Sequence, residues 1–143
     1  MAEDPRVARL RDFFETLTPD TLARLDAIYA PDARFKDPFN DVAGIGAIRG
    51  IFEAMYRQVS RPRFVITRSV SAGDDAFLTW EFVFSWKSDE SEHQTIRGAT
   101  HIQFAADGRV ALHRDYWDAA EELYEKLPVL GSLMRWLKRR ARH

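Results

Sequence analysis

Apolar residues recur at the three- and four-residue spacing of a helix in three stretches of the first 60 residues. Asp4 can cap the first of these helices, and Pro5 suits its first turn. Prolines follow the second and the third stretch, where they end a helical pattern. The pattern therefore predicts helices over residues 5–17, 19–29 and 46–59, with an extended segment over 33–37 and a loop over 38–44.

Alternating apolar and polar residues then predict four strands, over residues 63–71, 76–86, 94–104 and 109–117. In the first strand we expect Phe64, Ile66 and Val70 to face the core, with Arg68 interrupting their stripe. The second strand is predicted to point Leu78, Trp80, Phe82, Phe84 and Trp86 inward, and Thr79, Glu81, Val83 and Ser85 outward. Helices followed by consecutive strands indicate an α+β domain, in which the helices cover one face of a curved sheet.

The length of 143 residues suits one domain with one core. Hydrophobic residues make up 45% of the chain and aromatic residues 13%, which favours a bulky core or an aromatic-lined cavity. The chain has no cysteine, and its four histidines show no metal-ligand spacing, so we expect neither a metal site nor a cofactor. No apolar run is long enough for a signal peptide or a membrane span, and we expect a cytoplasmic protein.

Basic charge is concentrated at the C-terminus. Residues 135–143 hold five of the 21 Lys and Arg and no acid, which leaves 16 basic against 22 acidic residues, a net charge of −6, on the rest of the chain. An acidic body does not favour nucleic-acid binding. We predict a domain over 1–126 and a basic amphipathic helix over 127–143. That helix could serve as a lid or dimer strut, as a solvated helix or as a membrane-surface helix, and we expect it to pack on protein rather than on lipid.

Two acidic motifs stand 78 residues apart and are the strongest candidates for chemistry. Asp37 precedes Pro38, and Asp115 lies in the last predicted strand, where alternation puts His113 and Trp117 on the same face. A carboxylate in an apolar pocket can act as a proton donor or acceptor. The alternative for Asp37 is a turn in which its side chain bonds nearby backbone. His113 is either a hydrogen-bond partner of Asp115 or an edge residue.

The order of elements over about residues 7–118 resembles the nuclear transport factor 2-like superfamily, which includes steroid delta-isomerases, SnoaL-like polyketide cyclases and limonene epoxide hydrolase. The resemblance rests on YAPDARFKDP at 29–38, GAIR at 46–49 and RDYWD at 114–118. It implies a cone-shaped α+β fold with three N-terminal helices on a curved, mostly antiparallel sheet and a C-terminal helical tail. It also implies a homodimer with a pocket for a small apolar molecule.

The resemblance assigns roles to single residues. Asp37 is similar to the general base of the steroid isomerases, whereas Phe13 and Thr100 stand where those enzymes carry oxyanion donors. Asp115 is similar to an acidic residue of the epoxide hydrolase and of the cyclases. We therefore take Asp37 and Asp115 as candidate catalytic residues. Candidate ligand-binding residues are Phe13, Trp80, Phe82, Phe84, Thr100, His113 and Trp117.

Two hypotheses follow for function. In the first, the chain is a SnoaL-like or steroid-isomerase-like enzyme that transfers a proton without a cofactor, as an isomerase, cyclase or hydrolase. In the second, it is a non-catalytic ligand-binding or accessory dimeric module. The paired acids favour the enzyme, and Phe13 and Thr100 favour the binding module.

Overall fold

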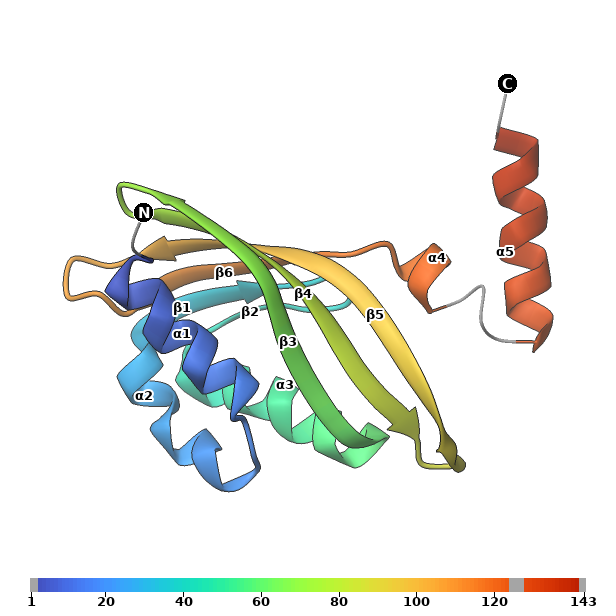
Figure 1. The fold of residues 1–143 in the computed structure, drawn as a ribbon, viewed down its shortest axis with the longest axis horizontal. Coiled ribbons are helices and arrows are strands. Elements are labelled where there is room, and N and C mark those ends of the chain that lie inside the picture. The colour runs from blue at the N-terminus through green and yellow to red at the C-terminus, as the bar shows by residue number, and fades with distance from the viewer. Residues whose placement is uncertain (1–2, 124–127, 142–143) are drawn as a thin grey trace.

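The fold is a curved sheet wrapped around three helical segments (Figure 1). The computed structural model describes residues 3–123 and 128–141, without the side chains of 128–132 and 134. The helical segments are α1 (Pro5–Glu15), a 3-10 turn η1 (Asp20–Arg24) continued by the short α2 (Leu25–Ile28), and α3 (Ile45–Gln58). The strands are β1 (Tyr29–Lys36), β2 (Asp41–Ala43), β3 (Val59–Ala72), β4 (Asp75–Trp86), β5 (Asp89–Phe104) and β6 (Val110–Tyr116).

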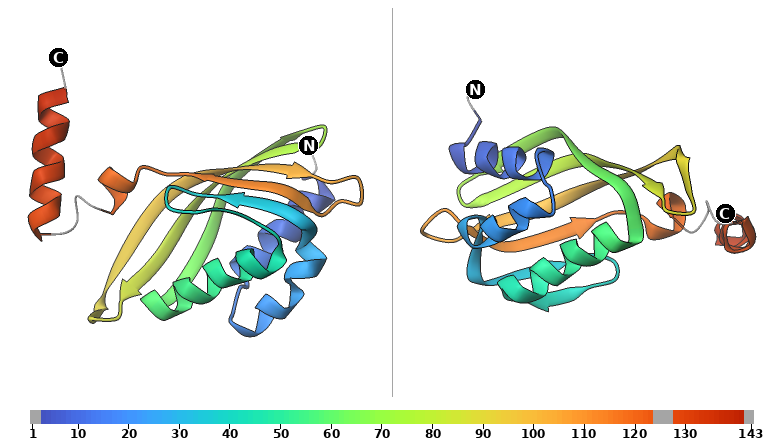
Figure 2. Two further views of the ribbon diagram at one scale, coloured as in Figure 1. Left: turned by 180° about the vertical axis from the view of Figure 1, so that it is seen from behind. Right: turned by 90° about the horizontal axis from the view of Figure 1, so that it is seen from below.

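The six strands form one sheet in the order β2-β1-β6-β5-β4-β3. Strands β3 to β6 are consecutive antiparallel neighbours, and β1 pairs with β6 in parallel. Figure 2 shows the long strands β3, β4 and β5 curving over the helices from one side. The predicted α+β class and the mostly antiparallel sheet are confirmed.

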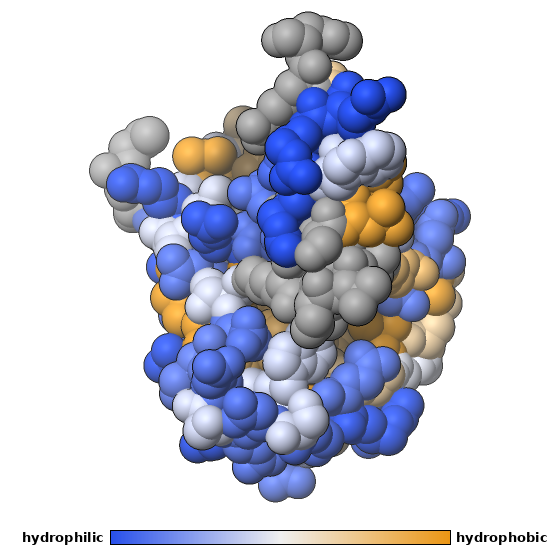
Figure 3. Space-filling view, turned by 90° about the vertical axis from the view of Figure 1, so that its right-hand side faces the viewer, coloured by the Kyte–Doolittle hydropathy of each residue, from blue (hydrophilic) through white to orange (hydrophobic). Residues whose placement is uncertain are grey.

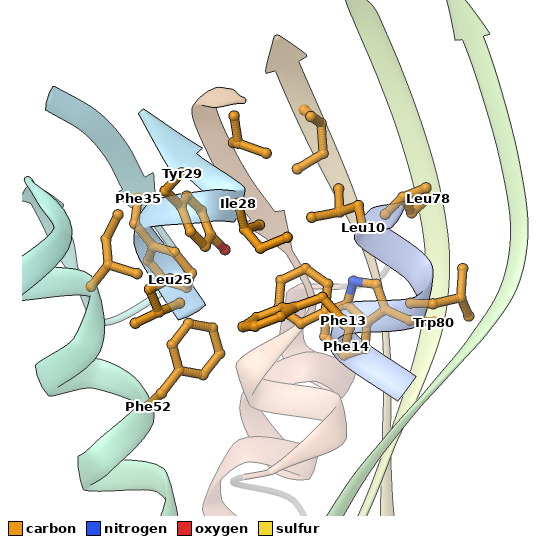
Figure 4. Close-up of a cluster of buried hydrophobic side chains, with 14 of the residues drawn as sticks. Leu10, Phe13, Phe14, Leu25, Ile28, Tyr29, Phe35, Phe52, Leu78 and Trp80 are labelled. Atoms are coloured by element: carbon orange, nitrogen blue, oxygen red, sulfur yellow. The ribbon is translucent and has the colours of Figure 1, made fainter. Parts of the chain in front are cut away.

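The helices bury their apolar stripes against the inner face of the sheet (Figure 4). Asp4 caps α1 by accepting a hydrogen bond from the Arg6 amide at 2.9 Å, and Pro5 opens the helix as predicted. The core joins α1, α2, α3 and the strands through Leu10, Phe14, Leu25, Ile28, Ile48, Phe52, Leu78 and Ile102. This packing holds α1 and α3 over the inner face of the sheet, and the candidate functional site lies between them.

The second helix ends one residue earlier than predicted, but the extended segment after it was predicted to start too late, at residue 33. β1 begins at Tyr29, so Pro31 lies inside a strand rather than beyond a helix. The ladder between β1 and β6 shifts register between Tyr29 and Arg34, and an irregular segment of this kind accommodates a residue without an amide hydrogen. The predicted loop over 38–44 also contains β2, which pairs Val42 with Phe35.

The predicted stripe of β3 was wrong beyond Ile66. A bulge between Ile66 and Arg68 shifts the register with β4, so Ser69 rather than Val70 stands opposite the inward Leu78. Arg68 and Val70 consequently face the outer side of the sheet, where Val70 is 67% exposed.

A second register shift affects the end of β4. The ladder with β5 is irregular between Phe84 and Trp86, and Ser85 is fully buried rather than exposed. Strand β5 also starts at Asp89, five residues before the predicted strand over 94–104.

Two helices follow the sheet. Asp118 caps α4 (Ala119–Glu122) by accepting from the Glu121 amide at 3.1 Å, and the buried Glu122 accepts a hydrogen bond at 3.0 Å from Arg97 of β5. α5 (Pro128–Ala141) stands apart from the sheet in Figures 1 and 2. Within the described part of the chain, no helix is long and apolar enough to cross a membrane.

Candidate functional site

A cavity of about 620 Å³ opens between the inner face of the sheet, α1 and α3. Eleven aromatic or histidine side chains contribute to its wall, and its acidic groups are Asp37 and Asp115. The two carboxylates that the sequence singled out therefore reach one cavity. The aromatic and histidine residues are Phe14, Phe35, Phe39, Phe52, Phe64, Trp80, Phe82, Phe84, Trp86, His113 and Trp117.

Asp115 is held by two donors on the same carboxylate oxygen. The Thr100 hydroxyl donates to Oδ1 at 2.5 Å from the neighbouring strand β5, and His113 Nε2 lies 2.7 Å from Oδ1 on Asp115's own strand. Thr100 stands opposite Asp115 in the antiparallel register, and His113 is two residues away, so both share the inner face. The other oxygen, Oδ2, has no hydrogen-bond partner among the described residues, and the Asp115 side chain is 17% exposed.

Trp80 extends this network across a third strand. Its indole Nε1 donates to the Thr100 hydroxyl oxygen at 2.7 Å. The ring lies against the backbone of Gly98, its register partner on β5, where a Cβ atom would stand 2.5 Å from two ring carbons. Only glycine at this position leaves room for the indole, so Gly98 sets the orientation of Thr100 through Trp80.

Tyr29 closes the other end of the network. Its hydroxyl lies 2.8 Å from His113 Nδ1, and both residues are buried. Burial, and secondarily the charge of Asp115, hold the pKa of Tyr29 well above its ordinary value of 10.0. Tyr29 therefore remains a phenol. His113 Nε2 faces the Asp115 carboxylate and carries a proton there, and in the tautomer with its proton on Nε2, Nδ1 accepts from the Tyr29 hydroxyl.

Asp37 has a different environment, although it also lines the cavity. Its Oδ1 accepts from the Phe39 amide at 2.8 Å, from the Asn40 amide at 2.7 Å and from Asn40 Nδ2 at 3.1 Å. These bonds form the turn between β1 and β2, which is the alternative that we considered for Asp37 before Pro38. Asp37 thus stabilises the turn at the mouth of the cavity.

Six of the seven predicted ligand-binding residues line the cavity: Trp80, Phe82, Phe84, Thr100, His113 and Trp117. Phe13 does not, because the turn of α1 places it in the core with its ring edge against Phe14. Phe14, one position further along the helix, faces the cavity instead.

Sequence reasoning missed Tyr29 and Gly98. Tyr29 had been placed at the end of a helical stripe, where its hydroxyl has no special meaning. Its position as the first residue of the YAPDARF motif could have indicated a strand, and a strand would have pointed it inward. Within the residues that the structure describes, no group of three or more His, Asp or Glu side chains is arranged to hold a metal ion.

The profile of the SnoaL-like domain family matches residues 10–113, which is most of the chain, and Asp115 and Trp117 lie just beyond the matched range. The chain belongs to the SnoaL-like domain family. Among curated proteins, none matches the sequence of this SnoaL-like chain.

Solved structures share the SnoaL-like fold at low sequence identity. A putative SnoaL-like polyketide cyclase from Jannaschia sp. CCS1 is 16% identical, with a TM-score of 0.70 over 85% of this chain and 93% of that one. TsrD from Streptomyces laurentii is 19% identical, with a TM-score of 0.72 over 92% and 99%. A ketosteroid-isomerase-like protein from Catenulispora acidiphila, solved with trimethylamine, is 16% identical, with a TM-score of 0.72 over 85% and 92%. At these identities the likeness supports the fold alone.

Proposed function

We propose that this chain binds a small, mostly apolar molecule in the cavity and moves a proton on it with Asp115. The observation that carries the proposal is the arrangement of that carboxylate. Thr100 and His113 hold Oδ1, while Oδ2 has no described partner and the surrounding wall is aromatic. A carboxylate fixed on one oxygen is oriented for proton transfer through the other.

The chemistry that fits best is isomerisation or ring closure of a carbonyl compound. Asp115 Oδ2 takes a proton from a carbon next to the carbonyl group, and the electron pair of that C–H bond moves toward the carbonyl oxygen. In isomerisation, Asp115 returns this proton to a different atom of the molecule. In ring closure, the carbon that lost the proton bonds instead to a second carbonyl carbon of the molecule, the π electrons of that carbonyl group move to its oxygen, and Asp115 returns the proton to that oxygen. This sequence needs no cofactor, because the substrate supplies and receives the electrons.

His113 and Tyr29 support the carboxylate in this scheme. His113 holds Asp115 through Nε2, and the Tyr29 hydroxyl contacts Nδ1 of the same ring, so the imidazole that orients Asp115 is fixed at both nitrogens. Asp37 is the second candidate carboxylate. Asp37 Oδ1 already accepts hydrogen bonds within the turn, so we expect Asp37 to contribute less to proton transfer than Asp115 does.

The second candidate is a binding module without catalysis. A developing negative charge on a carbonyl oxygen needs hydrogen-bond donors, and these usually contribute most to catalysis. The Thr100 hydroxyl is directed at Asp115, and Phe13 has no hydroxyl. Neither position therefore offers a donor to a ligand, and this favours the module.

A substrate screen followed by substitutions tests the proposal. Small enones, epoxides and polyketide-like aromatic compounds are offered to the purified chain, and any activity is measured again with Asp115→Asn. We expect a loss of roughly 10²–10⁴-fold in kcat for Asp115→Asn, with unchanged ligand affinity. Asp37→Asn should lose less, and Asp75→Asn, on the outer face of the sheet, should lose nothing.

Activity that survives Asp115→Asn would contradict the proposed role of this carboxylate. Ligand binding without turnover across the whole screen would instead support the binding module.

A further inference from the structure

The charged groups that line the cavity through acidic or basic side chains are both carboxylates. Asp37 and Asp115 belong to its wall, and within the part of the chain that the structure describes no lysine or arginine does. Most of the remaining wall is apolar, so water screens the field of the two carboxylates less there than at an open surface. A cavity of one sign of charge attracts groups of the opposite sign, and this cavity therefore favours a cation.

The two basic residues nearest to these acids in the sequence are directed away from the cavity. Lys36 and Arg114 are register partners on β1 and β6, and the preceding pair, Phe35 and His113, lines the cavity. Because side chains alternate along a strand, Lys36 and Arg114 face the outer side of the sheet. The Arg114 guanidinium lies there over the ring of Tyr116, 4.7 Å from its centre.

A second hollow, of about 570 Å³, adjoins the cavity and is also acidic. It shares Asp37, Asp115 and Trp117 with the cavity, and it adds Asp118 to the two cations of the outer side. Three carboxylates therefore stand against two bases in this hollow. The three shared side chains mark the place where the hollow and the cavity meet.

The basic residues of α5 do not change this balance. Figure 3 shows strongly hydrophilic side chains of α5 above the main body of the molecule, and none of the described residues of this helix lines the cavity. The charge of the cavity wall is therefore set by its own two acids.

Two aromatic rings stand beside these acids. Phe39 and Trp117 line the cavity, with ring centres 5.6 Å apart and ring planes at 73°. Each follows one of the acids by two residues, and the Phe39 amide donates to Asp37 Oδ1. Phe39 is 54% exposed, so a bound molecule can cover its ring. The face of an aromatic ring attracts cations, and rings combined with a carboxylate suit protonated and quaternary amines.

Asp37 has an oxygen that can accept from such a group. Its Oδ1 is held by the turn, whereas Oδ2 has one contact among the described residues, with Asn40 Nδ2 at 3.2 Å. A carboxylate oxygen has two lone pairs, so Oδ2 can accept a further bond. A cation beside Asp37 also leaves Asp115 Oδ2 available for proton transfer.

We propose that the molecule bound in the cavity carries a cationic nitrogen, as a protonated or quaternary amine. The nitrogen lies beside Asp37 Oδ2 and against the rings of Phe39 and Trp117, and the apolar body of the molecule extends into the cavity. This proposal names the substrate class of the same site, and in that sense it rests on the proposed function.

A cation in this position supplies a charge that the site lacks. Neither Thr100 nor Phe13 offers a donor to the carbonyl oxygen of a ligand. When Asp115 takes a proton from the carbon next to the carbonyl group, negative charge develops on that oxygen, and the nitrogen of the same molecule attracts it. A ketone with an amine close to its carbonyl group is the substrate class that fits both the wall and the chemistry.

Three ketones of similar size test the proposal, with binding to the full chain measured by titration calorimetry. Phenacyltrimethylammonium carries the cation, neopentyl phenyl ketone replaces the nitrogen by carbon, and benzoylpropionate carries an anion. We expect the cation to bind at least about tenfold more tightly than its neutral isostere, and the anion to bind most weakly. Salt on the order of 0.5 M should weaken binding of the cation and leave that of the neutral ketone unchanged.

Substitutions locate the cation. Asp37→Asn keeps an acceptor for the turn, and it should weaken binding of the cation by roughly fivefold or more without changing that of the neutral ketone. Phe39→Leu should weaken binding of the cation about threefold. Asp32→Asn is the matched control, because Asp32 is an exposed acid of β1 that does not line the cavity. It should bind both ketones like the parent chain, and circular dichroism checks that each variant is folded.

Hydrogen exchange separates this inference from the proposed function. Proton NMR in deuterium oxide measures exchange at the carbon next to the carbonyl group, relative to the rate without protein. Equal affinity for the cation and its neutral isostere would overturn the inference, as would a preference that survives Asp37→Asn and Phe39→Leu together. Exchange of the neutral ketone that depends on Asp115 would in that case leave the proposed function standing. Binding of the cation that depends on Asp37, without exchange, would uphold the inference and contradict only the catalytic role of Asp115.

Discussion

At the scale of single residues, the site is a chain of hydrogen bonds that crosses four strands. Tyr29 donates to His113, His113 and Thr100 donate to Asp115, and Trp80 donates to Thr100. Each donor has one acceptor, and the proton positions follow from the two contacts with the Asp115 carboxylate, which accepts from His113 Nε2 and from the Thr100 hydroxyl. A buried network of this kind is satisfied only as a whole. Removal of one member consequently affects groups that it does not touch.

Tyr29 should make the fold less stable as the pH becomes alkaline. Because burial raises its pKa above 10.0, the folded chain keeps a proton that the unfolded chain releases above pH 10. Stability should therefore fall as pH rises through this window. Tyr29→Phe should remove up to about 1.4 kcal/mol of that loss per pH unit. Urea unfolding at pH 8, 10 and 11 measures the slope for both proteins.

Phe35→Leu is the control for this measurement. It disturbs packing beside the same imidazole, whose ring centre lies 4.5 Å from that of Phe35, without removing a titrating group. It should lower stability equally at all three pH values. Equal slopes for the parent chain and Tyr29→Phe would show that this phenol does not stay protonated in the fold.

Part of this network could be predicted from sequence and part could not. Strand alternation placed His113 and Asp115 on one face, because β6 is regular there. The role of Tyr29 could not be predicted, since it depends on the residue at which the second helix ends and β1 begins. The role of Gly98 could not be predicted either, because this residue leaves space for Trp80, which belongs to another strand.

At the scale of elements, irregularities in the strands decide which side chains enter the core. The bulge in β3 turns Arg68 and Val70 outward, and the shift at the end of β4 buries Ser85. Side-chain alternation with a period of two cannot predict these two irregularities, because each one moves the residues that follow it to the other face of the sheet. Helix periodicity, by contrast, predicted α1 and α3 to within two residues at each end.

The turn between β1 and β2 provides a test of Asp37 that does not require a substrate. Asp37→Ala removes the acceptor for two amide groups and the Asn40 side chain, and should cost about 1–2 kcal/mol of unfolding free energy. Asp37→Asn, which keeps an acceptor oxygen, should cost less. Thermal or urea unfolding followed by circular dichroism measures both.

Asp41→Ala is the matched comparison for the turn. Asp41 is exposed, and its ion pair with Arg34 is a surface pair, so its removal should cost below about 1 kcal/mol. If Asp37→Ala were no more costly than Asp41→Ala, the bonds in this turn would not stabilise the fold, and Asp37 would be better explained by chemistry.

At the scale of the whole molecule, the sheet has one covered and one open face. The helices occupy the inner face, while the outer face carries a row of register partners: Val70, Phe77, His101 and Arg114. Phe77 is 52% exposed and stacks on His101, with ring centres 4.6 Å apart. Tyr116, 50% exposed, lies beside Arg114. Exposed aromatic and arginine side chains of this kind are typical of protein interfaces.

We expect this outer face to form the interface of a homodimer, which is the assembly that the resemblance to the superfamily implies. A twofold axis through this face would bring the same surface of both subunits together, and we expect the arginines of each subunit to meet Glu81 and Asp75 of the other. Phe77→Glu would bury an unpaired carboxylate in that interface and should weaken association at least roughly 100-fold. Light scattering at micromolar concentration should then give the mass of a dimer for the parent chain and of a monomer for the variant.

Phe39→Glu is the control for this measurement. Phe39 is a similarly exposed phenylalanine that lines the cavity, and this variant should remain dimeric. A parent chain with monomer mass would leave the outer face without a partner and end the dimer hypothesis.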